Sequence, residues 1–357
     1  MIAIDSDILK LPKAELHVHI EGTVTPDMAR KKAAAHGLSL PADIFSADGK
    51  SYEWGGFVDL VTRVYDAVAQ TVRTRQDYED IAYDYLKRCA AENCLYVELI
   101  ISPDHAKRFG LSYKDMVEGI AAGIDRARAD FGIEARMNAA LVRHLPQADV
   151  DAAAQTIVSY KHPYVVGLDL AGAEKSGDIP RFRPTFKFIK GWTGGQMGWR
   201  IHAAEAAGAE NARAALDLHV KRIGHGVRAV EDPAVLADLV KSGTHLEICP
   251  TSNVLAGLYP DYKAHPLTQL RAAGVRFSLN SDDPGLFGNS IGTEYQVAHD
   301  HFGLSPAQLS AVTRTAIEDS FVDDKAKKLL LQKVDAYGFF LNQNKAGGPN
   351  PGPTPAP

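Results

Sequence analysis

The chain alternates between short apolar segments and longer amphipathic ones, and this alternation constrains the fold more than any other feature. The apolar segments are rich in β-forming residues and read as strands. They cover residues 14–20, 95–102, 135–142, 165–170, 199–203, 222–227, 245–249 and 275–280. Between them, residues 77–92, 115–131 and 232–241 show the clearest helical spacing of apolar side chains. Nearly continuous apolar strands are typical of a parallel sheet buried on both faces.

Eight strand–helix units in 357 residues predict an α/β protein of the (β/α)8 TIM-barrel type. The length alone would also allow two ordinary domains. Because the eight strand–helix units favour one barrel, we expect a single barrel domain over residues 1–341. Residues 342–357 are rich in Asn, Gly and Pro and are predicted to be a disordered tail. The glycine-rich residues 191–198 precede a strand and match no phosphate-binding pattern, so we expect a connecting loop.

Composition narrows the possible partners and compartment. The net charge is −5 and no Lys/Arg-rich run is present, which argues against a nucleic-acid partner. No apolar stretch approaches the length of a membrane span, and the N-terminus lacks the apolar core of a signal peptide. Three cysteines without a Cys-x-x-Cys pair indicate a reducing cytoplasm. Cys249 is predicted to be a buried strand residue rather than a nucleophile. The oligomeric state is left open.

Polar side chains follow four of the predicted strands at their carboxyl ends. They are His17 and His19, then His202 with Glu205, then His225, and finally Asp282 with Asp283. The carboxyl ends of barrel strands meet at one face, where active sites are assembled. Three histidines and a carboxylate form a suitable ligand set for one divalent metal, most simply zinc. Further acidic and basic groups beside such a metal are typical of a hydrolase.

Each of these residues also has a purely structural interpretation. His17 and His19 point to the same side of a strand, but His-x-His alone is a weak signal. Glu205 could instead cap the first turn of a helix over residues 206–219. His225 could be a satisfied core histidine, and its neighbours Gly224 and Gly226 would let another group approach closely. Asp283 shares a site with Asp282 only if the chain turns at Pro284 and Gly285.

Seven segments, in order along residues 11–321, resemble the adenosine deaminase family of the amidohydrolase superfamily. The first is Leu11 to Gly22, which includes His17-Val18-His19, and the second is Tyr96-Val97-Glu98 with Ser102-Pro103. The others are Val166 to Gly172, His202-Ala203-Ala204-Glu205, Arg222-Ile223-Gly224-His225-Gly226, Cys249-Pro250-Thr251-Ser252-Asn253, and Leu279 to Pro284.

The resemblance implies one zinc ion per chain, held by His17, His19, His202 and Asp282. It also implies a hydrolase of purine metabolism that replaces the 6-amino group of an adenine ring with oxygen from water. In this reading Glu205 protonates ring N1, His225 orients the attacking group, and Asp283 contacts both that group and N7. The residues implied to contact the substrate are His19, Glu21, Gly172 and Asp283, with the backbone N–H of Gly172 on N3.

Two departures from the family pattern bear on the substrate. The usual His-Ala-Gly-Glu is His-Ala-Ala-Glu here, and the methyl group of Ala204 is expected to narrow the approach to the purine. Many adenosine deaminases have Asp where this chain has Glu21, and glutamate there resembles the family's adenine deaminases and its deaminases of modified nucleosides. Gly172 and Gly224 instead match the nucleoside enzymes. We expect adenosine, converted to inosine and ammonia, as the substrate. The alternatives are adenine, a 5′-modified adenine nucleoside, or an inactive homologue that only binds. His105 and His144 are expected to be structural.

Overall fold

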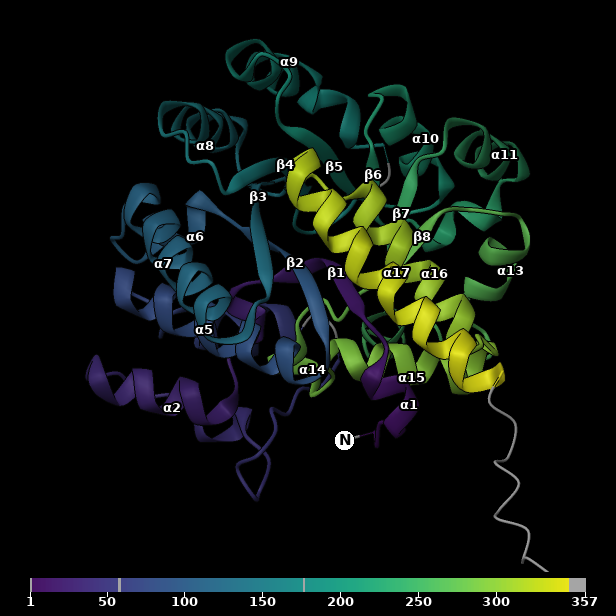
Figure 1. The fold of residues 1–357 in the computed structure, drawn as a ribbon. Coiled ribbons are helices and arrows are strands. Elements are labelled where there is room, and N and C mark those ends of the chain that lie inside the picture. Colours follow the sequence, from purple (N-terminus) through teal and green to yellow (C-terminus); the bar gives the residue numbers. More distant parts are fainter. Residues whose placement is uncertain (1, 57–58, 176, 347–357) are drawn as a thin grey trace, which may run out of the picture.

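In the computed structural model, which describes residues 2–56, 59–175 and 177–346, eight parallel strands form one sheet in sequence order (Figure 1). The sheet curls into a barrel with helices around it, as predicted. The strands are β1 Lys13–His19, β2 Cys94–Ile101, β3 Glu134–Val142, β4 Val165–Ala171, β5 Gly198–Ala203, β6 Arg222–His225, β7 His245–Ile248 and β8 Phe277–Leu279. Each overlaps its predicted segment, and the last is shorter than predicted because the chain leaves the ladder after Leu279.

The barrel closes between its first and last strands through a few specific contacts rather than a full ladder. The side chain of Asn280 accepts a hydrogen bond from the backbone N–H of Leu16 at 2.8 Å. Val18 and Asp282 form an isolated parallel bridge, in which the N–H of His19 donates to the carbonyl of Asp282. Closure therefore places Asp282 directly beside the two histidines of β1.

Helices follow the strands and cover the outside of the barrel (Figure 1). They are α1 Ser6–Lys10, α2 Pro26–Ala35, α4 Asp66–Ala69, α5 Arg75–Ala91, α6 Pro103–Arg108, α7 Tyr113–Phe131, α8 Gln147–Ser159, α9 Arg183–Thr193, α10 Ala209–Asp217, α11 Pro233–Ser242, α12 Pro250–Leu255, α13 Leu267–Ala272, α14 Pro284–Phe287, α15 Ile291–Phe302, α16 Pro306–Asp319 and α17 Asp324–Ala346, with short helical turns η1 Glu21–Thr23, η2 Ala42–Ile44, η3 Leu60–Tyr65, η4 Ile179–Phe182 and η5 Val227–Glu231. The three helices predicted most clearly correspond to α5, α7 and α11.

Two predictions at element boundaries need correction. Residues 191–198 are not a loop throughout, because α9 continues to Thr193 and ends on Gly194 in the left-handed conformation, which glycine adopts without strain. The predicted tail also begins too early. Helix α17 runs to Ala346, so only residues 347–357 of the predicted tail remain, and they lie outside the described residues.

The interior of the barrel is charged, although its strands read as apolar runs. Arg200, Arg222, Glu98, Glu247 and Asp169 are all fully buried inside it. Arg222 pairs with both glutamates, while Arg200 pairs with Glu247 and Asp169. A buried ion-pair network gains little over apolar packing, but removing one partner leaves an uncompensated charge. Two of these carboxylates, Glu247 and Asp169, also contact histidines of the candidate metal centre.

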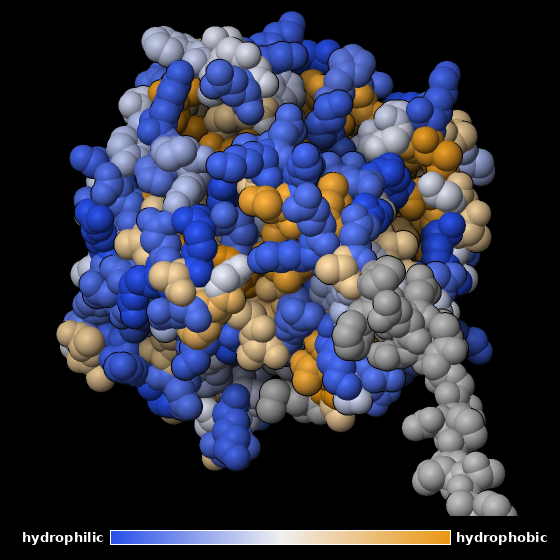
Figure 2. All heavy atoms as spheres, in the orientation of Figure 1, coloured by the Kyte–Doolittle hydropathy of each residue, from blue (hydrophilic) through white to orange (hydrophobic). Residues whose placement is uncertain are grey.

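Helices α16 and α17 run side by side in front of the strands (Figure 1). Leu330 and Val334 of α17 pack with residues of α16 against Ala14, Leu16 and Tyr96 at the beginnings of β1 and β2. The outer surface of the molecule on this side is mostly hydrophilic, with only small apolar patches (Figure 2). Among the described residues, no helix is both long enough and apolar enough to cross a membrane.

Candidate metal centre and active site

Four predicted ligands converge at the carboxyl ends of β1, β5 and β8. Oδ1 of Asp282 lies 3.3 Å from Nε2 of His17 and 3.4 Å from Nε2 of His19. Nε2 of His202 lies 3.3 Å from Nε2 of His19. The donor atoms of the three histidines all lie within 4.8 Å of one another. Three imidazoles and one carboxylate oxygen therefore surround a single point, as one divalent ion requires.

The partners of these ligands leave the metal-facing atoms available. Glu247 lies 3.0 Å from Nδ1 of His17, and Asp169 lies 3.0 Å from Nδ1 of His202. The hydroxyl of Ser252 donates to Oδ2 of Asp282 at 2.7 Å. Metal-binding histidines generally bond a carboxylate through their second nitrogen in this way. Nε2 of His17 is buried without a hydrogen-bond partner, which a bound cation would satisfy. The donor set thus fits a metal.

His225 ends β6, and its ring lies 4.7 Å from the ring of His17, measured between centroids. A Cβ at the neighbouring Gly224 would lie 3.0 Å from both Nη2 of Arg200 and Cε1 of His17. The predicted close approach to the backbone at Gly224 is therefore made by the side chains of His17 and Arg200. Cys249 is also close to the centre, but its thiol is buried and donates to the carbonyl of Glu247. This supports its predicted structural role, one residue past the end of β7.

Glu205 lies in the loop between β5 and α10. Because α10 begins only at Ala209, Glu205 is not in its first turn, and the helix-cap interpretation does not fit. Its Oε1 lies 3.5 Å from Nε2 of His225. Burial, reinforced by the negative charges of Asp282 and Glu174, raises the pKa of Glu205 to about 8. The raised pKa favours the protonated side chain, which can act as an acid.

Glu174 anchors the loop that carries Glu205, and the sequence analysis did not find it. Its carboxylate accepts four successive backbone N–H groups, those of residues 204–207, at 2.6 to 3.0 Å. The side chain of Asn211 donates a further hydrogen bond. Successive N–H groups that point inward form a nest for an anion, and here the anion belongs to the chain itself. The sequence signal available for Glu174 was its position, two residues after the segment that resembles the family and ends at Gly172.

Ala204 lies in this loop with a φ of +54°. The left-handed region costs an L-residue about 1–2 kcal/mol, which explains why glycine is usual in the family motif. Ala204 is fully buried and belongs to the hydrophobic core. The methyl group of Ala204 therefore adds backbone strain, and its expected narrowing of the purine pocket stays a prediction.

Asp283 reaches the same site because the chain turns immediately after it into α14, as Pro284 and Gly285 predicted. Its Oδ1 is buried and has no hydrogen-bond partner. The backbone of Gly22 packs directly against this side chain, since a Cβ at Gly22 would lie 1.9 Å from Oδ1. Gly22 therefore provides the space that Asp283 occupies.

Glu21, one of the residues implied to contact the substrate, is enclosed, with only 3% of its surface exposed. The hydroxyl of Tyr78 donates to its Oε1 at 2.9 Å, and Nδ1 of His105 lies 3.5 Å from the same oxygen. Burial opposes ionisation, but the charge of His105 lowers the pKa of Glu21. His105, expected to be only structural, thus contacts a predicted substrate residue.

Gly172 follows β4 with a φ of +91°, in the left-handed region that favours glycine. A Cβ there would lie 2.7 Å from Nδ1 of His144. The same nitrogen accepts a hydrogen bond from the N–H of Ala173. His144 therefore supports the Gly172 loop, in agreement with its expected structural role.

Strained backbone is concentrated at this site. Five described non-glycine residues have positive φ, and three of them are Ala204, His225 and Asp282. Such conformations cost about 1–3 kcal/mol each and persist only where the surrounding structure enforces them. The strain therefore marks this end of the barrel independently of the side-chain chemistry.

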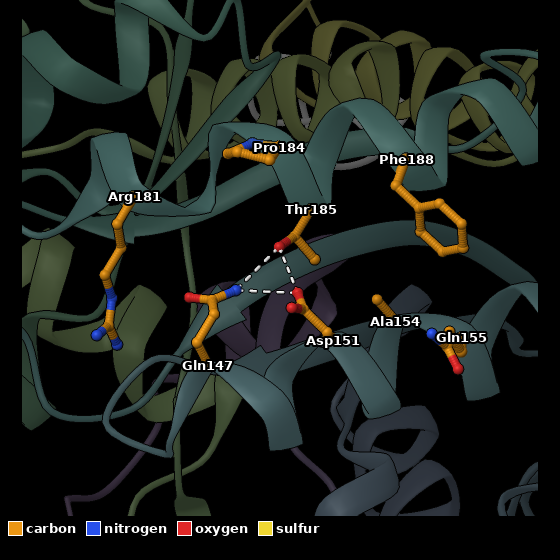
Figure 3. Close-up of a pocket in the computed structure, with 8 residues that line it drawn as sticks. All are labelled: Gln147, Asp151, Ala154, Gln155, Arg181, Pro184, Thr185 and Phe188. Atoms are coloured by element: carbon orange, nitrogen blue, oxygen red, sulfur yellow. Dashed lines mark hydrogen bonds between the residues drawn. The ribbon is translucent and has the colours of Figure 1, made fainter.

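A cleft of about 560 Å³ lies elsewhere, between α8 and α9 (Figure 3). Its polar side chains Gln147, Asp151 and Thr185 hydrogen-bond to one another at 2.9 to 3.2 Å. None of the predicted site residues lines it.

The parallel barrel, the convergent histidines and carboxylate, and the buried Glu205 beside them are the features of a metal-dependent hydrolase. A profile of the adenosine deaminase family matches residues 12–337. The chain therefore belongs to the adenosine deaminase family, whose members are hydrolases of C–N bonds in cyclic amidines.

Named relatives agree with this assignment. The chain is 40% identical to an adenine deaminase of Rhizobium leguminosarum bv. trifolii (strain WSM2304), over 91% of this chain and 99% of that protein. It is 42% identical to an adenine deaminase of Chelativorans sp. (strain BNC1), over 91% and 98%. The crystal structure of an adenine deaminase from Arthrobacter aurescens superposes with a TM-score of 0.84 at 28% identity, covering 92% of this chain and 99% of that one.

Proposed function

We propose that this protein hydrolyses adenine to hypoxanthine and ammonia. The observation that carries the proposal is its similarity, at 40–42% identity over nearly the whole chain, to relatives named adenine deaminase. It replaces adenosine, our expectation from the sequence. Gly224, which had favoured a nucleoside, has a sufficient reason in the packing of His17.

The environment of Glu21 supports a free base. Its carboxylate is enclosed and already accepts a hydrogen bond from Tyr78. His105 lies beside this carboxylate, and the ring of Tyr65 lies 5.6 Å from the ring of His105. The glutamate side chain is one methylene longer than the aspartate of many adenosine deaminases. We infer that Glu21 and its neighbours fill the space that a ribose would need.

The remaining roles follow from the chemistry of each group. We assign His17, His19, His202 and Asp282 as ligands of one zinc ion, which when bound lowers the pKa of a coordinated water toward about 7. Glu205 gives its proton to N1 of the purine and so makes C6 electrophilic. His225 and Asp283 orient the attacking oxygen, and Asp283 also faces N7. The N–H of Gly172 binds N3, and His19 borders the substrate. The oxygen of water bonds to C6 and the bond from C6 to the amino nitrogen breaks. One proton of the water leaves with the amino group as ammonia, and the other restores the proton of Glu205.

We further propose, from the state of its cysteines, that the protein works in a reducing compartment such as the cytoplasm. Cys89, Cys94 and Cys249 are all buried free thiols. Proteins of oxidising compartments more often use their cysteines in disulfides.

A substrate panel on the zinc-loaded protein tests the proposal. We expect kcat/KM for adenine to exceed that for adenosine by at least ~10², because an enclosed pocket rejects a bulky substituent. Ammonia release and chromatography of hypoxanthine against inosine distinguish the products. Faster turnover of adenosine would overturn the choice of adenine but not the deaminase class. Failure to deaminate any aminopurine would favour an inactive binding homologue.

A further inference from the structure

A chain of three hydrogen bonds leads to Nδ1 of the buried His225. The N–H of Leu267 donates to Nδ1 of His265 at 3.2 Å. Nε2 of His265 lies 3.1 Å from Oδ1 of Asn253. Nδ2 of Asn253 lies 3.2 Å from Nδ1 of His225. His265, Asn253 and His225 are each at most 3% exposed, so water does not compete for these bonds.

The first donor in this chain determines the direction of every later bond. A backbone N–H can only donate, so Nδ1 of His265 must accept and carries no proton. Burial lowers the pKa of His265 to about 4, and the neutral ring therefore carries its proton on Nε2. This proton is donated to Oδ1 of Asn253. The amide of Asn253 then presents its N–H2 group to His225, whose Nδ1 must accept.

We propose that Asn253 and His265 are positioning residues that hold His225 with its proton on Nε2. That nitrogen points toward the reaction centre, where it lies 3.5 Å from Oε1 of Glu205. In this tautomer His225 donates a hydrogen bond to the attacking oxygen and stabilises charge that develops on it. The other tautomer would present a lone pair there. The effect on turnover rests on the proposed function of His225, whereas the tautomer itself does not depend on which purine is the substrate.

The surroundings keep the chain of bonds rigid. The ring of His265 packs against the rings of Tyr259 and Phe302, with centroids 5.1 and 5.6 Å away. Asn253 belongs to α12, the helix whose Ser252 also bonds the predicted ligand Asp282. One short helix therefore orients a ligand of the metal and the neighbouring His225.

Nitrogen-15 NMR of the full zinc-loaded chain, labelled at histidine and without substrate, tests the tautomer directly. The ring-nitrogen shifts identify which nitrogen is protonated, and a spectrum of His225→Gln assigns the signals. We expect a proton on Nε2 of His225 and none on Nδ1. A protonated Nδ1 in the unmodified protein would overturn the proposal. This result is independent of adenine turnover, so it can fail separately from the proposed function.

Variants test whether the chain of bonds sets the tautomer and matters for catalysis. At pH 8 the ionised carboxylate of Asn253→Asp can only accept, so the proton of His225 should move to Nδ1. We expect kcat to fall at least ~10² at nearly unchanged KM and zinc content. The proposal would be contradicted if the proton of His225 stayed on Nε2 in this variant. It would also be contradicted if the proton moved to Nδ1 and kcat kept its wild-type value.

His265→Gln and His265→Leu form a matched pair, because only the glutamine can still donate to Oδ1 of Asn253. We expect Gln to retain the tautomer and most of kcat, and Leu to lose both. Equal kcat in the two variants would assign His265 to packing alone. Should a variant not fold, the NMR result on the unmodified protein still decides the proposal.

Discussion

The backbone N–H of Glu205 donates to the carboxylate of Glu174 at 3.0 Å, so the proposed acid lies beside a second carboxylate that orders its loop. This arrangement serves geometry and electrostatics together. The four N–H bonds fix the path of residues 204–207, and the negative charge of Glu174 helps to keep Glu205 protonated.

Replacing Glu174 with Gln should shift the pH profile of the enzyme. Glu205 acts while protonated, so activity falls as pH rises through its pKa of about 8. Removing the neighbouring negative charge lowers that pKa, and the alkaline limb of kcat/KM should move to lower pH. We also expect kcat to fall about tenfold, because the loop loses acceptors. The exposed Asp217→Asn is the control, and an unshifted limb in Glu174→Gln would refute the electrostatic role.

Glu205→Gln should retain the metal and lose catalysis. The amide preserves the shape of the side chain but cannot transfer a proton to N1, so kcat should fall by at least ~10². The alkaline limb of the pH profile should also disappear, since the group that titrates near 8 is gone. Steady-state kinetics with metal analysis checks both, and near-normal kcat would exclude Glu205 as the acid.

His202→Ala should lose metal and activity together. One of three convergent imidazoles is removed, and Asp169, which lies beside its Nδ1, loses that partner. We expect most of the zinc to be lost and kcat to fall by at least ~10³. Metal analysis by mass spectrometry is the measurement. Full zinc content with normal turnover would show that the ligand set is wrong.

Gly22→Ala should impair catalysis through Asp283. The new methyl group would lie 1.9 Å from Oδ1 of Asp283, so the aspartate must move. We expect kcat to fall by at least ~10² while far-ultraviolet circular dichroism is unchanged. Gly191→Ala is the matched control, since a Cβ there meets nothing within 4 Å and should leave kcat intact. Normal kcat in Gly22→Ala would remove Asp283 from the reaction.

Ala204→Gly should be neutral or stabilising by up to about 1.5 kcal/mol. Glycine relieves the strain of a φ of +54°, worth about 1–2 kcal/mol, but adds about 0.5–1 kcal/mol of unfolded-state entropy. The control is Ala212→Gly in α10, which should lower the free energy of unfolding by about 1 kcal/mol. Urea denaturation measures both. Equal destabilisation would mean that Ala204 is not strained.

Sequence alone predicted the barrel and the identity of its polar strand ends. Apolar periodicity is local, and in a parallel barrel it also fixes where the strand ends lie, so His17, His202 and Asp282 could be placed together. The turn that brings Asp283 alongside was likewise readable from Pro284 and Gly285. The tertiary structure alone decided what orients these groups. Glu247 and Asp169 approach the ligands from other strands, and their roles depend on packing between segments far apart in the chain.

The same limit applies to the acid and to the substrate. Glu174 contacts the Glu205 loop only because β4 and β5 are neighbours, and a positive φ at Ala204 cannot be read from an alanine. The contacts of Glu21 with Tyr78 and His105 likewise join residues far apart in the sequence. Local sequence determines secondary structure and which chemical groups are present. Their protonation, orientation and available space depend on neighbours that only the folded chain brings into contact.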